Sequence, residues 1–306
     1  MSMHRLNSVT IGVPEVDSAR AYYQDFGLTP EADGWFATQD GGRQLKITHA
    51  PTRRLVALSI GADDSDDLHR IAAQLSKHGF DAKLEGDRLV SAEPVTGIGV
   101  EVVVTARVVP QAVPQTPYNG PGRDERGADR APVITRVGPV RPRKLGHVVV
   151  GSIDQEASQR YFAKGIGLKV SDDITGLATF MRCSTDHHNV LVQSSPVNFL
   201  HHTSWEVDDL DEVGRGAVRM LEGNPERHVW GLGRHLVGSN FFWYLRDPAG
   251  NFTEYYSDLD CIVDDALWKP RVWDAASSMT LWGPPLPPSF LQPEDLAGMM
   301  AGAHQP

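Results

Sequence analysis

The sequence predicts an α+β fold in which two similar domains follow one another along the chain. Three observations lead to this prediction. The length of 306 residues is sufficient for two domains that each bury a core. One order of elements, with a strand, a helix, further strands, a second helix and a closing strand, occurs twice. A proline-rich stretch, residues 108–143, separates the two copies.

The two copies correspond first in their opening strand and helix. In the first copy a strand over residues 5–12 precedes an amphipathic helix over residues 17–23 with an acidic or hydroxyl N-cap. In the second copy a strand over residues 145–150 precedes a helix that Asp154 caps and that contains Tyr161. Both helices end at a Gly-Leu pair, as expected where glycine adopts the left-handed conformation of a helix C-terminus.

The later elements correspond as well. A strand around Ser59 leads through an acidic cap into a helix, as does the segment from Thr203 to Asp209. A Pro-x-x-Gly or Pro-Ala-Gly turn then precedes the strands that contain Glu101 and Glu254. The chain is therefore predicted to be an internal duplication.

These patterns divide the chain into four segments. We expect an N-terminal domain over residues 1–107, a linker or surface excursion over 108–143, a second domain over 144–262 and a Trp/Pro-rich tail over 263–306. Seven prolines in residues 108–143 leave too little apolar area for independent folding. The tail contains Trp268, Trp273 and Trp282, which are costly to leave in water, so we expect it to pack onto the second domain and cover its opening.

Charge and composition exclude several classes of function. The net charge of −10 and the pI near 5.6 argue against a nucleic-acid-binding surface. No segment approaches the ~20 apolar residues of a membrane span, and the N-terminus lacks an apolar leader. Cys183 and Cys261 have no C-x-x-C partner, which argues against a disulfide framework or a zinc ribbon. We expect a cytoplasmic protein that forms a homo-oligomer, either a dimer or a tetramer.

Three strands of the second copy carry polar residues that a buried strand does not favour. They contain His147, the pair His201 and His202, and Glu254. Because burying an unpaired polar group costs several kcal/mol, each must have a partner, and a metal ion is the natural one. Two imidazoles and one carboxylate leave coordination positions open on Fe(II). Strand alternation places His201 and His202 on opposite faces, but periodicity alone does not choose between them.

The first copy serves as an internal control for this metal site. In the first copy, Ser8 corresponds to His147, Ala57 to His202, and Glu101 to Glu254. Only the carboxylate has a counterpart, so we expect metal in the second domain alone.

Each candidate also has an ordinary structural explanation. A single strand histidine is more often hydrogen-bonded than metal-bound, although three polar residues on matched strands reverse those odds. Glu254 could lie at the surface of an edge strand, and the aromatic run around Tyr244 is more often core. His188 could be a surface residue beside an exposed His187.

Several motifs together resemble those of the type I extradiol ring-cleaving dioxygenases of the vicinal oxygen chelate superfamily. The resemblance covers nearly the whole chain and depends on the following segments: Lys144-Leu145-Gly146-His147, Asp186-His187-His188-Asn189, Leu200-His201-His202-Thr203, Gly233-Arg234-His235, and Tyr244 followed by Asp247-Pro248-Ala249-Gly250 and Glu254-Tyr255-Tyr256.

The resemblance implies two tandem vicinal oxygen chelate domains, each made of paired βαβββ modules around a mixed sheet. It implies that His147, His202 and Glu254 bind Fe(II), with Mn(II) as the alternative metal. It also implies that His188 is the acid/base residue. His235 and Tyr244 would contact oxygen and the substrate hydroxyls.

The implied activity is cleavage of a catecholic ring beside its two hydroxyls, with incorporation of both atoms of O2, in the catabolism of aromatic compounds. Two alternatives remain on the same fold. One is a metal-dependent isomerase or epimerase of the glyoxalase type, which usually draws a fourth protein ligand. The other is a non-catalytic protein that binds an aromatic ligand.

Overall fold

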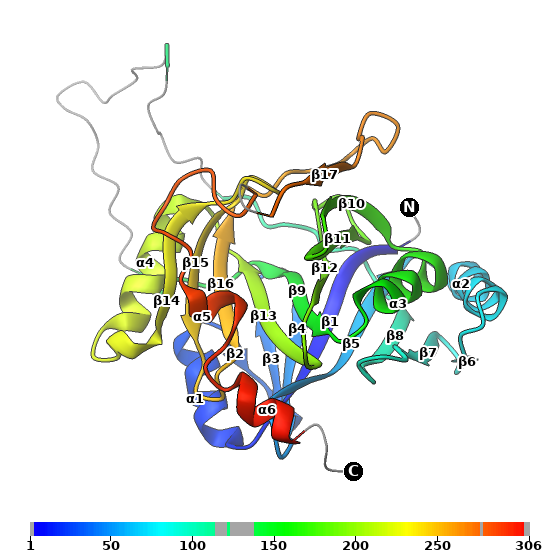
Figure 1. Cartoon of the computed structure of the whole chain (residues 1–306), viewed down its shortest axis with the longest axis horizontal. Helices are drawn as coiled ribbons and strands as arrows, with labels where there is room; N and C mark the ends of the chain where they lie inside the picture. Colours follow the sequence, from blue (N-terminus) through cyan, green and yellow to red (C-terminus); the bar gives the residue numbers. More distant parts are fainter. Residues whose placement is uncertain (1–2, 114–120, 123–137, 276–277, 303–306) are drawn as a thin grey trace.

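The computed structural model describes residues 3–113, 121–122, 138–275 and 278–302, and it contains two mixed β-sheets (Figure 1). The first sheet has eight strands in the order β2-β3-β4-β1-β5-β8-β7-β6. These strands are β1 (Met3–Val13), β2 (Thr29–Pro30), β3 (Trp35–Thr38), β4 (Gly42–His49), β5 (Arg54–Ala62), β6 (Ala82–Leu84), β7 (Arg88–Ala92) and β8 (Gly99–Val104).

The second sheet has nine strands in the order β14-β15-β16-β13-β9-β12-β11-β10-β17. Without β17, and read from the β10 end, this order repeats that of the first sheet strand for strand, with β9 in the place of β1. The strands are β9 (Lys144–Ser152), β10 (Lys169–Ile174), β11 (Ala178–Arg182), β12 (Val190–Ser194), β13 (Phe199–Glu206), β14 (His228–Arg234), β15 (Phe241–Arg246), β16 (Phe252–Ser257) and β17 (Arg271–Trp273).

The helices follow the expected order, and three of them begin at an aspartate whose side chain accepts a backbone N–H. These caps are Asp64, Asp154 and Asp209. The expected cap of α1 is wrong, because Glu15 makes no capping hydrogen bond. The α-helices are α1 (Val16–Asp25), α2 (Ser65–Lys77), α3 (Gln155–Arg160), α4 (Leu210–Leu221), α5 (Pro288–Leu291) and α6 (Leu296–Gly302); a π-helical turn (Tyr161–Ile166) follows α3, and short 3-10 turns occur at Ala32–Gly34 and Pro225–Arg227.

Strand register confirms the duplication residue by residue. In the first sheet Ser59 pairs with Ser8 on one side and with Glu101 on the other. In the second sheet Ser204 pairs in the same way with His147 and Glu254. The two domains therefore have the same vicinal oxygen chelate fold, and the expected equivalence of Ser8 with His147 and of Glu101 with Glu254 is confirmed.

The first domain packs directly behind the strand that carries Glu254. The ring of Phe26 stacks on Tyr255 with centroids 3.9 Å apart, and the Tyr255 hydroxyl donates to the Phe26 carbonyl at 2.6 Å. The Tyr22 hydroxyl lies 2.5 Å from the Thr253 hydroxyl. Because side chains alternate along a strand, Thr253 and Tyr255 face the first domain while Glu254 faces the other way.

The segment after β16 crosses the second domain, as expected for the Trp/Pro-rich tail (Figure 1). Strand β17 pairs in parallel with β10, and the Trp268 indole donates to the Ser171 carbonyl. Farther on, Phe290 is 3% exposed and packs against Phe252. Asp295 forms an ion pair with the buried Arg53 of the first domain. This packing is confirmed, whereas the exact domain boundaries stay predictions and much of the expected linker lies outside the described residues.

None of the helices in the described ranges is long and apolar enough to cross a membrane.

The register predicts that the chain binds one redox metal, in the second domain. We expect metal analysis to give one ion per chain, and we expect Glu254→Ala combined with His202→Ala to abolish it. Glu101→Gln should leave metal content unchanged and alter stability by roughly 0.5 kcal/mol or less, because Glu101 is a partly exposed partner of Arg88. Two tightly bound ions per chain would contradict this prediction.

Candidate metal centre

Three adjacent strands of the second sheet bring His147, His202 and Glu254 together. They lie on β9, β13 and β16, and one ligand atom from each falls within 4.8 Å of the other two. The Nε2 atom of His147 is 3.1 Å from Glu254 Oε2, and that of His202 is 3.7 Å from the same oxygen. All three side chains are buried. The expected set of two imidazoles and one carboxylate therefore exists as a spatial cluster.

A β-bulge changes the expected relation between His201 and His202. Strict alternation would place their rings on opposite faces, and this expectation is wrong because the register with β9 shifts between Leu200 and His202. The two Nδ1 atoms lie 2.7 Å apart, and both rings line the same cavity. His201 Nε2 in turn lies 2.6 Å from the Phe290 carbonyl.

These contacts fix where His202 carries its hydrogen. A carbonyl only accepts, so His201 donates through Nε2 and, when neutral, accepts at Nδ1. His202 must then donate through Nδ1, which leaves a lone pair on its Nε2. That Nε2 atom is buried and has no hydrogen-bond partner among the described residues. Since an unpaired buried acceptor is costly, a cation beside Glu254 fits this atom.

The Glu254 carboxylate is fully buried yet well supplied with donors. Ser204 donates to Oε2 at 2.5 Å, and Asn240 donates to Oε1 at 3.0 Å. Burial raises the pKa of Glu254, but the hydrogen bond from His147 and the nearby imidazoles outweigh it, so the pKa lies below its ordinary value. The residue is therefore an anion at neutral pH and offers a negative charge to a cation.

The three further candidates lie on the same cavity as the cluster. His188, His235 and Tyr244 all line it, and the rings of His147 and His188 have centroids 4.1 Å apart. His235 Nε2 lies 2.9 Å from the Tyr244 hydroxyl, and His235 Nδ1 lies 2.7 Å from the Met279 carbonyl. The surface explanation of His188 is wrong, because His187 and His188 are 0% and 4% exposed.

Apolar side chains form most of the remaining cavity wall. Free space of about 60 Å³ lies between the histidines and a set of residues that includes the following: Val149, Ile174, Leu177, Phe180, Leu191, Val237, Met279, Phe290 and Leu291. A larger and more polar cavity of about 890 Å³ shares no residue with this one and contains none of the metal-cluster residues. The wall facing the histidines is therefore mostly apolar, as is typical of small-molecule sites.

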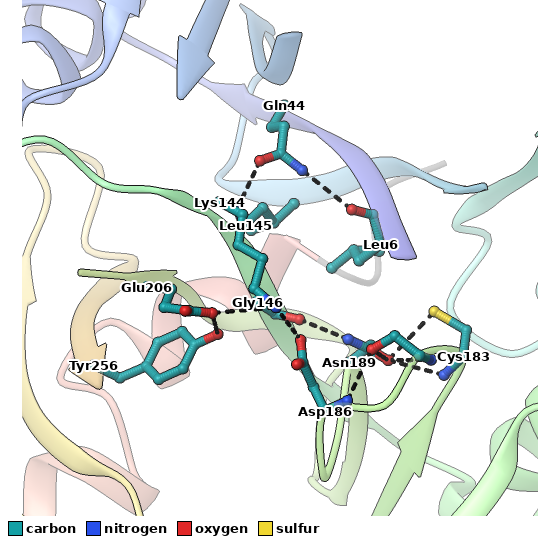
Figure 2. Close-up of polar contacts among 11 residues, drawn as sticks. Leu6, Gln44, Lys144, Leu145, Gly146, Cys183, Asp186, Asn189, Glu206 and Tyr256 are labelled. Carbon is teal, nitrogen blue, oxygen red and sulfur yellow. Dashed lines mark hydrogen bonds and ion pairs between the residues drawn. The ribbon is translucent and has the colours of Figure 1, made fainter. Parts of the chain in front are cut away.

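A polar network fixes the turn that carries His188 (Figure 2). The Asn189 amide donates to the Gly146 carbonyl, next to His147, and its oxygen accepts from the backbone N–H groups of Cys183 and Ser184. Lys144 forms ion pairs with Asp186 at 2.7 Å and with Glu206 at 3.1 Å. These contacts hold the turn against β9 and thereby set the distance between His188 and His147.

Sequence reasoning missed several of the supporting residues. Ser204 lies two residues after His202 on the same strand, so period-two alternation could have indicated it. Asn240 and Asn189 gave no comparable signal, because an amide in a loop has many ordinary roles.

Comparison with known proteins agrees with this geometry. Residues 144–255 match the sequence profile of the Glyoxalase/Bleomycin resistance protein/Dioxygenase superfamily. Metapyrocatechase 2 of Cupriavidus necator is 29% identical over 301 residues, which cover 95% of this chain and 92% of that protein. An iron-dependent extradiol dioxygenase of Rhodococcus jostii is 27% identical over 154 residues, which cover 45% of this chain and 50% of that protein.

A solved structure shows the same fold over the whole chain. The Mn(II)-bound glyoxalase of Novosphingobium aromaticivorans superposes with a TM-score of 0.72 at 24% identity, covering 95% of this chain and 98% of that one. The resemblance stated from the sequence motifs is thus confirmed. Residues 144–255 thus match the Glyoxalase/Bleomycin resistance protein/Dioxygenase superfamily, and along nearly its whole length the chain is similar to a metapyrocatechase.

Proposed function

We propose that this protein cleaves a catecholic ring beside its two hydroxyls, using O2 and a divalent metal held by His147, His202 and Glu254. The observation that carries the proposal is the convergence of this metal cluster with His188, His235 and Tyr244 on one apolar cavity. The similarity to Metapyrocatechase 2 over almost the full length of both chains supports it. Fe(II) is the proposed metal and Mn(II) the alternative, since the relatives include proteins named for each.

The ligand set explains why a metal would be useful here. Two neutral imidazoles and one carboxylate leave several positions of Fe(II) open, so both oxygens of a catechol and O2 can be brought within reach of each other. The apolar wall keeps bulk water away from the reacting ring. The protein itself supplies orientation and proton transfer.

His188 is the proposed proton-transfer residue. Burial and the neighbouring imidazoles lower the pKa of His188 well below its ordinary value, so the ring is neutral and can accept a proton from a substrate hydroxyl. Burial and the Glu254 charge raise the pKa of Tyr244 well above the usual value, so it stays a phenol. Its O–H donates to His235 Nε2, and its oxygen can accept a hydrogen bond from a substrate hydroxyl. We propose that Tyr244 and His235 orient the substrate oxygens from the side opposite the β9 strand.

We also propose that the protein is cytoplasmic and forms a homodimer or a homotetramer. Both cysteines are free thiols, as is usual for a cytoplasmic protein. Size-exclusion chromatography with light scattering would test the predicted dimer or tetramer.

Incubation of the ferrous-loaded protein with a panel of substituted catechols in air tests the activity. Ring cleavage should consume one O2 per catechol and give a yellow ring-fission product. An isomerase or epimerase would convert its substrate without O2, and a binding protein would shift the catechol spectrum without turnover. Absence of oxygen uptake with every catechol, despite full metal loading, would reject the proposal.

The roles of His188 and His202 can be separated by substitution. His188→Asn leaves the three proposed ligands intact, so the protein should keep its metal and bind catechol anaerobically, while turnover falls about 10²–10⁴-fold. His202→Asn should lose the metal. Metal content and turnover are measured on the same samples. A metal-free His188→Asn protein, or one that is fully active, would refute the assigned role.

The C-terminal segment should matter for substrate entry, because Met279, Phe290 and Leu291 form one wall of the cavity. Truncation before Trp268 should raise the apparent substrate constant or uncouple O2 uptake from ring opening. The substitution Leu291→Ala is a milder form of the same change, since Leu291 is 36% exposed and contributes little to the core. Unchanged kinetics in both variants, with circular dichroism showing a folded protein, would rule out this role.

A further inference from the structure

Behind His188 lies a second histidine that the proposed reaction does not use. His187 is 0% exposed, and its Nδ1 lies 3.1 Å from the Nδ1 of His188. On the other side of the ring, His187 Nε2 lies 3.4 Å from Asp172 Oδ2. The edges of Phe180 and Trp268 contact the His187 ring and hold its plane. Asp172, His187 and His188 thus form a chain of three groups that ends at the cavity.

The Asp172 carboxylate is itself fixed by the C-terminal segment. The Trp273 indole donates to Oδ2 at 2.8 Å, and the Arg271 backbone N–H donates to Oδ1 at 2.7 Å. Burial raises the pKa of Asp172, but the hydrogen bonds from His187, Arg271 and Trp273 outweigh it and bring the pKa below its ordinary value. Asp172 is therefore a carboxylate, and a carboxylate can only accept hydrogen bonds.

The positions of the hydrogens follow from this end of the chain. His187 must donate to Asp172 through Nε2, and a neutral His187 then has a lone pair on Nδ1. His188 must donate to that lone pair through its own Nδ1. The nitrogen of His188 that remains for the cavity is Nε2, and it carries a lone pair and no hydrogen. This is the form that a general base requires.

We propose that Asp172 and His187 are positioning residues that orient the His188 ring and hold its hydrogen on Nδ1. The inference rests on the proposed acid/base role of His188 and adds two residues to it. In this arrangement β17 contributes to the reaction through Asp172, without contacting the substrate. For metal-ligating histidines, removing an outer partner that fixes the tautomer in this way changes metal affinity or activity by about 10–100-fold.

The hydrogen position on His188 can be measured independently of activity. In the full-length protein, labelled with ¹⁵N-histidine and loaded with diamagnetic Zn²⁺, ring nitrogen shifts distinguish an N–H from a bare nitrogen. The His188 signals are identified by their loss in His188→Asn. We expect the hydrogen on Nδ1. A wild-type His188 that carries it on Nε2 overturns the proposal, even if the protein cleaves catechols.

Three substitutions at His187 separate its two hydrogen bonds. His187→Phe keeps the ring contacts and removes both hydrogen bonds. His187→Gln can still donate toward Asp172 but offers no acceptor to His188, whereas His187→Asn places an amide oxygen near the former Nδ1. We expect kcat to fall about 10–100-fold in the Phe and Gln variants, with little change in KM, metal content or anaerobic catechol binding. The Asn variant should recover most of the loss.

The same variants also distinguish failure of this inference from failure of the proposed function. If no catechol is cleaved by the wild-type protein, the nitrogen shifts of His188 in wild type and in His187→Gln still decide the hydrogen position. If catechols are cleaved and all three variants have wild-type kcat, His187 has only a structural role and the inference is wrong. Should His187→Phe fail to fold, the comparison of the Gln and Asn variants gives the decision.

Discussion

The buried negative charge of Glu254 is the constraint on which the second domain depends. A carboxylate with no exposed surface costs several kcal/mol unless its oxygens are fully hydrogen-bonded or paired with a cation. Ser204 and Asn240 satisfy part of this requirement, and His147 and His202 approach from the neighbouring strands. The charge of Glu254 would be compensated further by a cation held between Glu254 and the two imidazoles, whose nitrogen atoms lie within 4.8 Å of its carboxylate oxygen.

The first domain has no buried counterpart of this charge among its described residues, and it packs behind β16. Its counterpart of Glu254 is Glu101, which is partly exposed and pairs with Arg88, so no buried charge needs compensation there. Instead, Tyr22 of α1 and Phe26, the residue after the helix, pack against the far side of β16. The residues of this contact are buried, and they lie on the face of β16 opposite Glu254. The first domain thus packs directly against the strand that carries Glu254.

Much of the fold and the cluster could be predicted because it depends on local pattern. Strand periodicity, aspartate caps and the repeated element order are visible in the residues, and the repeat made the comparison of Ser8 with His147 possible. The relation of His201 to His202 could not be predicted, because it depends on a bulge that only the pairing of β13 with β9 reveals. Asp172 was equally hidden, since it reaches His187 across strands that are adjacent only in the folded sheet. Long-range pairings of this kind leave no trace in local sequence.

Three histidines of the site depend on one late segment of the chain. His235 hydrogen-bonds to the Met279 carbonyl and His201 to the Phe290 carbonyl. His187 depends on the same segment through Asp172, whose carboxylate accepts a hydrogen bond from Trp273. Except for β17, which belongs to this segment, the strands of both sheets precede it in sequence and are therefore translated before it. Until this segment has been translated, His235 and His201 lack the carbonyls that accept their hydrogen bonds. The strands that carry the metal cluster are therefore complete before the groups that hold the surrounding histidines in place.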